Sequence, residues 1–203
     1  MTDYKALFSK ENAYERLIEL KESGALFEDI PVLKECFECE QETVHHCYNV
    51  GEHIMHSVME AVNRGYSPVI CTAMLLHDTG KPAAKKYDEN GTAHFFSHAL
   101  ISADIAKKIV PEMESFSDEE KREILFLVKE HDRFMRDYKK KTVRKFMNEY
   151  GYDYCCDLAY VRYCDTLAQS EYKRDEKLEN IRRFEDMTDE MRSSAANDNI
   201  QRK

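Results

Sequence analysis

The chain has 203 residues, of which 42% are hydrophobic and 34% are charged, and its formal net charge is −9. This length allows one domain with a full hydrophobic core, and the acidic balance argues against an extended nucleic-acid surface. The longest apolar run covers residues 69–76, which is far too short to span a bilayer, so no membrane association is predicted.

Helix-forming patterns run through nearly the whole chain. Glycine occurs only 6 times and proline only 4 times, and no stretch alternates with the period of two that is typical of strands. The expected helices cover residues 4–20, 31–37, 43–63, 68–77, 97–110, 117–131, 142–150 and 153–170. A charged loop is expected between them at residues 78–92. We therefore predict the all-α class.

The domain organisation follows from where apolar residues become sparse. A single helical domain is predicted for residues 1–170, with a core of roughly 20–170, and a charged C-terminal helix or tail is predicted for 171–203. Three of the expected helices have local signals at their N-terminal ends. These signals are Pro68 after Ser67 at the first helical position, a capping box from Ser117 to Glu120, and a capping serine at Ser97. The oligomeric state has no signal in the sequence.

The location in the cell is predicted from the cysteines and the first residues. Residues 1–5 lack the basic segment and apolar run of a secretory signal. Seven cysteines are an odd number for a disulfide framework, and three of them lie in the apolar segment 153–170. Reduced thiols fit this pattern better, so a cytoplasmic protein is expected.

The sequence His77-Asp78-Thr79-Gly80-Lys81 directly follows the most apolar run. A neighbouring imidazole and carboxylate form a metal-ligand pair of borderline softness, which suits Zn, Mn, Fe, Co or Ni. One such pair carries little weight, because His131-Asp132 is another. The interpretation depends on whether further ligands accompany it.

Further candidate ligands are histidines on several predicted helices. His46 and His53 fall on one face of the helix 43–63, so both can point inward. His98 lies near the start of the next helix but one, and His131 ends the helix after that. The remaining histidines have the weaker positions, and we interpret them as ordinary structural residues: His45, His56 and His94.

Asp165 is a carboxylate among apolar neighbours in the segment 153–170. A buried carboxylate is costly unless it is paired or ligates a metal ion. Arg162, one turn earlier, is an alternative partner for it, and position alone leaves ligation and ion pairing nearly equal.

The order of these residues resembles the HD-domain superfamily of metal-dependent phosphohydrolases, whose core is an all-α bundle. The resemblance covers roughly residues 20–170. It implies metal ligands at His53, His77, Asp78, His98, His131 and Asp165. Residues 26–53 and those from 142 onward look most similar to the HD domain attached to bacterial CCA-adding tRNA nucleotidyltransferases. Asn49 stands where that subgroup often has aspartate. No nucleotidyltransferase segment accompanies it here, so tRNA end synthesis is not expected from this polypeptide alone.

The expected chemistry uses two divalent ions, of Mn, Fe, Co, Ni or Zn, with Mg also compatible. Two such ions ~4 Å apart can share Asp78, generate hydroxide near neutral pH and hold a phosphoryl oxygen. Lys81 can hold a phosphate oxygen and offset developing charge, which makes Asp78 and Lys81 the predicted catalytic residues. Arg144 has a planar fork that suits phosphate, and His46 can donate a proton to the leaving oxygen or orient the substrate.

We therefore predict a phosphomonoesterase or phosphodiesterase that acts on a small phosphorylated substrate, a nucleotide or a cyclic phosphate. One alternative is a non-catalytic, metal-stabilised domain that binds a nucleotide or a tRNA-processing partner. Another is a di-iron oxygenase, since some proteins of this fold hold two iron ions. Lys81 in the signature favours phosphate chemistry over oxidation.

Overall fold

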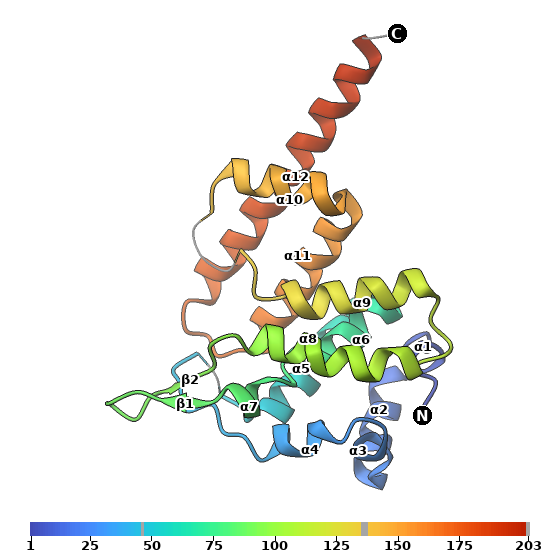
Figure 1. The fold of residues 1–203 in the computed structure, drawn as a ribbon, viewed down its shortest axis with the longest axis vertical. Helices are drawn as coiled ribbons and strands as arrows, with labels where there is room; N and C mark the ends of the chain where they lie inside the picture. Colours follow the sequence, from blue (N-terminus) through green and yellow to red (C-terminus); the bar gives the residue numbers. More distant parts are fainter. Residues whose placement is uncertain (46, 135–137, 202–203) are drawn as a thin grey trace.

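The computed structural model describes residues 1–45, 47–134 and 138–201, and it confirms the all-α class (Figure 1). The elements are, in chain order, α1 (Tyr4–Phe8), α2 (Ala13–Ser23), α3 (Ala25–Asp29), α4 (Val32–Phe37), α5 (Val50–Asn63), α6 (Pro68–Leu76), α7 (Lys81–Ala84), β1 (Lys86–Tyr87), β2 (Ala93–His94), α8 (His98–Ile109), the 3-10 turn η1 (Val110–Glu112), α9 (Asp118–Glu130), α10 (Lys140–Tyr150), α11 (Tyr152–Leu167) and α12 (Arg174–Gln201).

Helix α6 lies at the centre of the bundle. Every residue from Val69 to Leu76 is buried, and α6 packs against α1, α5, α9 and α11. A helix that is apolar on all faces must be surrounded by other helices, which explains this position. Its start is the predicted one, because the Ser67 hydroxyl accepts a hydrogen bond from the Ile70 amide at 3.3 Å. The residues that follow Leu76 therefore emerge inside the bundle.

Helix α5 is shorter than the predicted helix 43–63, and its N-terminal part was wrongly predicted. The helix begins at Val50, where Asn49 and Glu52 form a reciprocal capping box. Asn49 accepts from the Glu52 amide at 2.8 Å. The Asn-x-x-Glu pattern satisfies the first amides of a helix that starts at Val50. The described residues 43–45 and 47–49 are therefore outside the helix.

The N-terminal segment differs from prediction in a similar way. The expected helix 4–20 is two helices, α1 and α2, separated by the polar residues 9–12. Helix α1 packs against α6, whereas α2 packs against α5 and α3. One continuous helix could not turn its apolar face toward both sets of neighbours, so the chain is interrupted between them. The short helix α3 was not predicted.

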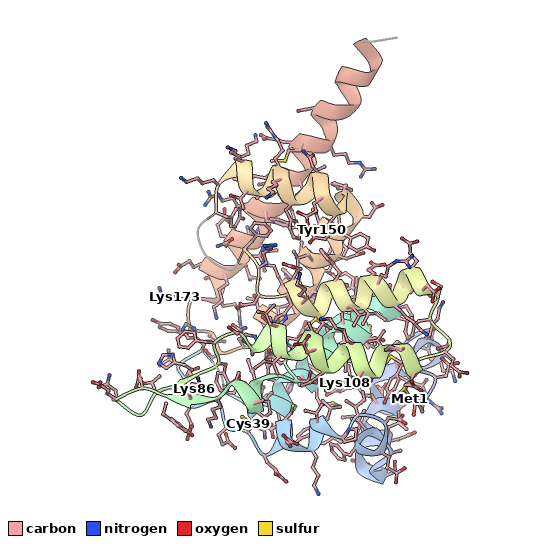
Figure 2. The ribbon with its side chains drawn as sticks, in the orientation of Figure 1. Met1, Cys39, Lys86, Lys108, Tyr150 and Lys173 are labelled. Atoms are coloured by element: carbon pink, nitrogen blue, oxygen red, sulfur yellow. The ribbon has the colours of Figure 1, made fainter. Side chains whose placement is uncertain are left out.

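The predicted loop 78–92 contains structure of its own. Helix α7 begins at Lys81, and β1 pairs with β2 in an antiparallel hairpin that projects from the bundle (Figures 1 and 2). Ser97 is the N-cap residue of α8 (His98–Ile109), as predicted, but it does not cap the helix through its side chain. Ser97 has a left-handed backbone with φ of 62°, and its side chain makes no capping hydrogen bond. The predicted capping box at Ser117 is confirmed.

Helix α12 packs along α11 and α10, and its end extends beyond the bundle (Figure 1). It buries Ile181 and Phe184 completely or almost so, although its sequence is rich in charged residues. All seven cysteines are free thiols. Within the described part of the chain, no helix combines the length and apolarity needed to cross a bilayer.

Candidate metal centre

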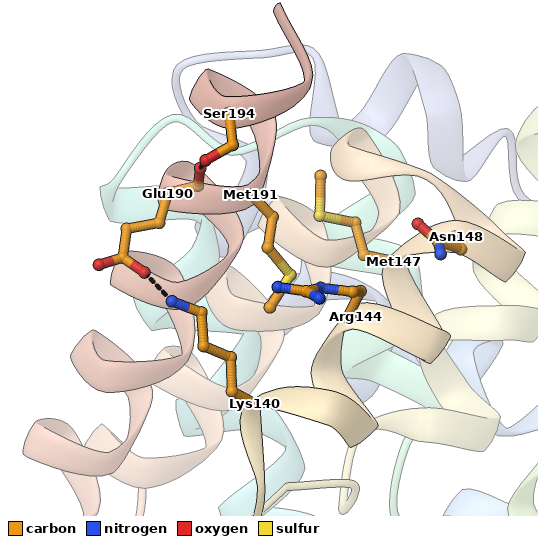
Figure 3. A pocket seen from close by; sticks show the side chains of 7 residues that line it. All are labelled: Lys140, Arg144, Met147, Asn148, Glu190, Met191 and Ser194. Carbon is orange, nitrogen blue, oxygen red and sulfur yellow. Dashed lines mark hydrogen bonds and ion pairs between the residues drawn. The ribbon is translucent and has the colours of Figure 1, made fainter. Parts of the chain in front are cut away.

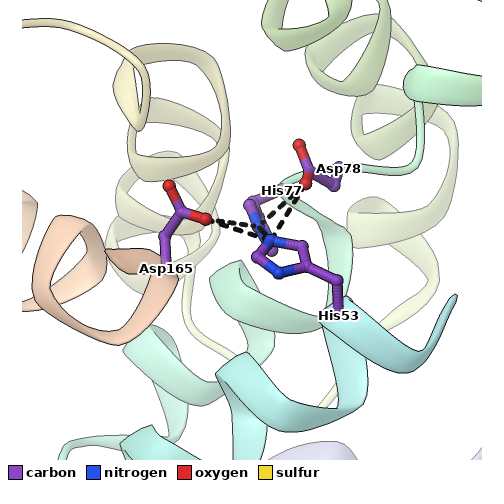
Figure 4. A group of neighbouring side chains, drawn as sticks. All are labelled: His53, His77, Asp78 and Asp165. Atoms are coloured by element: carbon purple, nitrogen blue, oxygen red, sulfur yellow. Dashed lines mark hydrogen bonds and ion pairs between the residues drawn. The ribbon is translucent and has the colours of Figure 1, made fainter. Parts of the chain in front are cut away.

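The first group of candidate ligands lies where α6 ends between α5 and α11. It consists of His53, His77, Asp78 and Asp165, all buried, with one potential ligand atom from each within 4.8 Å of the others (Figure 4). His53 Nε2 lies 3.2 Å from Asp78 Oδ2 and 3.0 Å from Asp165 Oδ1. His77 Nε2 lies 3.3 Å and 3.8 Å from the same two oxygens. This group could hold a metal ion.

The second group shares Asp78 with the first. His98, at the start of α8, places Nε2 3.2 Å from Asp78 Oδ1, and His131, at the end of α9, places Nε2 3.6 Å from it. These three residues also meet the geometry for a metal ion. The two oxygens of Asp78 thus face different groups: Oδ2 faces His53 and His77, and Oδ1 faces His98 and His131.

The four imidazoles are oriented in the same way. Each Nδ1 lies against a backbone carbonyl: Ala168 at 3.3 Å for His53, Met74 at 2.7 Å for His77, Phe95 at 2.8 Å for His98 and Val128 at 2.7 Å for His131. A hydrogen on Nδ1 satisfies these carbonyls, and this assignment leaves Nε2 with a lone pair. A carbonyl partner of this kind is usual for histidines that bind metals.

The distances between the Nε2 atoms of neighbouring histidines show whether a metal ion suits the site. Nε2 of His53 and His77 are 3.3 Å apart, and Nε2 of His98 and His131 are 3.1 Å apart. Two lone pairs at this distance repel each other unless a proton or another cation lies between them. Because both pairs also face carboxylate oxygens, the donor set suits a divalent ion that accepts imidazole and carboxylate.

The negative charge of the two carboxylates also suits a metal ion. Burial would raise the pKa of the Asp78 carboxyl, but Lys81 and the surrounding histidines reverse this effect and hold its pKa well below the usual range. Histidines hold the pKa of Asp165 low in the same way, against the effect of burial. Burial opposes charge on His77, yet the two carboxylates raise its pKa to about 10. A metal ion would displace that proton, so uptake of metal should depend on pH.

Lys81 places a positive charge directly beside Asp78. Its Nζ lies 2.6 Å from Asp78 Oδ2 and donates to Gln41 Oε1 at 2.8 Å. Gln41 is 1% exposed and donates in turn to the Tyr48 carbonyl at 3.1 Å. Gln41 was not predicted from the sequence, because it lies 40 residues before Lys81 and no local pattern joins them.

A second glutamine that was not predicted supports Asp165. Gln169 donates to Asp165 Oδ1 at 2.9 Å, and Lys177 on α12 donates to Gln169 Oε1 at 2.6 Å. The spacing of four residues from Asp165 was the available signal. Arg162, the alternative partner for Asp165, directs Nη2 to the Phe134 carbonyl at 2.7 Å.

An open cavity of about 260 Å³ gives access to the two groups. It is lined by Asp78, Lys81, Phe95, Phe96, Ser97, His98, His131, Asp132, Asp165 and Gln169. The cavity therefore reaches Asp78 from the surface, although the carboxylate itself is buried.

Two predicted substrate-binding residues are not part of this cavity's described lining. Arg144 lies on α10 and lines a separate pocket with Lys140, Met147 and Met191, between α10 and α12 (Figure 3). The prediction for His46 falls outside the described residues. The histidines interpreted as structural lie elsewhere: His45 packs on Tyr172, His56 stacks on Tyr48, and His94 pairs with Asp88.

Comparisons with known proteins agree with this arrangement of side chains. A family model described as HD domain matches residues 43–180. The chain is also 35% identical over 94 residues to the Multifunctional CCA protein of Azoarcus sp. (strain BH72), which is 44% of this chain and 21% of that relative. The matched part thus spans about a fifth of the relative's length.

Proposed function

Because the chain belongs to the HD domain family, we propose that it is a metal-dependent phosphohydrolase that cleaves a phosphomonoester or phosphodiester of a nucleotide or a cyclic phosphate. The observation that carries this proposal is the position of the Asp78 carboxylate, whose two buried oxygens face two separate histidine groups. One carboxylate that can serve two ions is the arrangement used in two-metal hydrolysis of phosphate esters.

The residues that would hold the ions follow from the two groups. His53, His77 and Asp165 would hold the first together with Asp78, and His98 and His131 would hold the second. When bound, divalent ions polarise a phosphoryl oxygen and lower the pKa of a water molecule. The imidazole-rich set favours Mn, Fe, Co, Ni or Zn over Mg, which prefers oxygen ligands.

Lys81 has the position of a residue that binds phosphate. It lines the cavity beside Asp78, and its Nζ is held by Asp78 and Gln41. An ammonium in this low-dielectric setting would attract a phosphate oxygen and offset the charge that develops on it. Arg144 plays no part in this proposal, because it lines a different pocket.

The test combines metal analysis with hydrolysis assays. The purified chain should contain or take up a transition metal, and with Mn, Co or Ni it should hydrolyse generic phosphoesters or 2′,3′-cyclic nucleotides. His77→Ala and Asp78→Ala should each abolish metal binding and turnover. His56→Ala is the matched control, since His56 stacks on Tyr48 outside both groups, and it should retain both. A chain that binds no transition metal and hydrolyses none of these substrates would refute the proposal.

A second candidate function is a non-catalytic, metal-stabilised domain that binds a nucleotide or a partner in tRNA processing. The observation that favours it is the 21% share of the Multifunctional CCA protein that the match covers, since the matched segment is one part of a longer chain there. Metal binding without hydrolysis, together with a higher melting temperature in the presence of nucleotide, would support this function instead.

A further inference from the structure

Phe96 is an exposed aromatic residue at the rim of the metal-centre cavity. Its side chain is 71% exposed, and it lines the same cavity as Asp78 and Lys81. Single exposed apolar residues are common on protein surfaces and need no explanation by themselves. Two further observations separate Phe96 from such residues.

The first observation is that Phe96 is held in place by its neighbours. Its ring stacks on His94 with centroids 5.2 Å apart and an angle of 5° between the planes. His94 is in turn anchored by Asp88, whose Oδ2 lies 3.0 Å from His94 Nε2. On the other side in sequence, Ser97 has a left-handed backbone with φ of 62°, which costs energy for a residue other than glycine. The segment between the hairpin and α8 thus presents the ring at a defined place.

The second observation is the contrast between Phe96 and its neighbours. Phe95 packs near Lys81, with Nζ 5.6 Å from the ring centroid, so it belongs to the inner wall of the cavity. Tyr87 and Leu100 are also exposed, at 57% and 55%, but they do not line the cavity. Phe96 therefore combines exposure with access to the site.

The size of the cavity makes this position relevant to a ligand. At about 260 Å³ it lies just below the ~300 Å³ at which small-molecule pockets begin, so a ligand larger than its phosphate-bearing end must extend over the rim. We propose that Phe96, backed by His94, is the platform on which the base of a nucleotide stacks while its phosphate lies beside Asp78 and Lys81. This inference rests on the proposed function and names the substrate class as phosphate esters that carry an aromatic base.

The absence of tryptophan from the chain provides a test by binding alone. In Phe96→Trp the new residue is the single tryptophan, and stacking of a base on it should quench its fluorescence. Adenosine 5′-monophosphate should quench it in a saturable way, whereas ribose 5-phosphate, which lacks the base, should not. Leu100→Trp is the matched control on the neighbouring helix, and neither compound should quench it. Equal response of Phe96→Trp to both compounds, or to neither, would overturn the proposal.

Kinetics provide the second measurement. Phe96→Ala should lower the ratio of kcat/KM for adenosine 5′-monophosphate to that for ribose 5-phosphate by roughly 5- to 150-fold, and Phe96→Tyr should restore it. An unchanged ratio would overturn the stacking platform while leaving the proposed hydrolysis intact. Saturable quenching without any turnover would instead support the platform and count against the hydrolysis, so the two failures can be told apart.

Discussion

Nε2 of His98 lies 3.1 Å from Nε2 of His131, although the two residues are 33 positions apart and lie on different helices. Both rings have Nδ1 against a carbonyl of their own preceding turn, and both Nε2 atoms face Asp78 Oδ1. The end of α9 and the start of α8 thus complete a second group around a carboxylate that the first group also uses.

Loss of either His98 or His131 should lower the number of metal ions bound per chain but leave one ion bound. We expect two transition-metal ions per wild-type chain, and one in His98→Ala or His131→Ala, because the first group keeps its four residues. Elemental analysis after desalting measures the ratio. A wild-type chain that holds one ion, with a content insensitive to either substitution, would contradict a dinuclear centre.

Metal binding should stabilise the fold, because the two groups join α5, α6, α8, α9 and α11. At a free Mn²⁺ concentration 100 times its Kd, the free energy of unfolding should rise by about 2.7 kcal/mol, and a chelator should reverse the change. Asp78→Asn removes the shared charge with little change of shape, so this variant should show almost no rise. Urea unfolding with and without Mn²⁺ measures both, and an equal rise in wild type and variant would show that Mn²⁺ acts elsewhere.

Gly80 should be needed for the approach of α8 to the site. A Cβ at this position would lie 2.5 Å from both the His98 carbonyl oxygen and the Ser102 amide nitrogen. Gly80→Ala should therefore cost about 1–3 kcal/mol of unfolding free energy and weaken metal binding at the second group. Gly65→Ala is the control, because a Cβ there would meet no atom within 4 Å apart from its neighbours in the chain, and only its φ of 65° is unfavourable. Denaturant titration and metal titration should show a metal defect in Gly80→Ala alone.

The side chain of Phe184 should make α12 a stabilising part of the hydrophobic core. Its side chain is fully buried, its ring stacks 5.0 Å from that of Phe134, and the Arg162 guanidinium lies 5.6 Å from the ring centroid. Phe184→Ala should lower the free energy of unfolding by about 3–5 kcal/mol, whereas Arg182→Ala on the exposed face should change it by less than about 0.5 kcal/mol. A loss as small as that of the control, measured by urea unfolding, would mean that α12 is only a peripheral attachment.

Glu123 should make stability depend on pH. Burial between α9 and α11, together with the neighbouring Asp157 carboxylate, raises the pKa of Glu123 from its ordinary value of 4.5 to about 8. The folded state then binds more protons than the unfolded state between these values, so stability should fall as pH rises from 4.5 to 8. Glu123→Gln has no such proton to lose. Its urea midpoint should fall less than that of wild type between pH 5 and pH 8, and parallel curves would contradict the assignment.

Much of the local structure could be predicted from the sequence, because its signals act within about four residues. Ser117 caps α9 as expected, and the apolar run before His77 forms a helix that is buried on all faces. The Asn49 capping box was equally readable, yet periodicity alone extended the helix too far toward the N-terminus. The order of histidines and aspartates along the chain likewise indicated a family and a candidate ligand set.

Other features were decided only by tertiary packing. No local pattern joins Gln41 to Lys81, directs the two oxygens of Asp78 toward different helices, or places Arg144 in a pocket between α10 and α12. These relationships depend on the approach of helices that are distant in sequence, and side-chain packing sets that approach. The sequence by itself thus determined the helical class and the candidate residues. The packing of α5, α8, α9 and α11 around the end of α6 decided which atoms meet, because a carboxylate and four imidazoles can share ions only when their backbones hold them within a few ångströms.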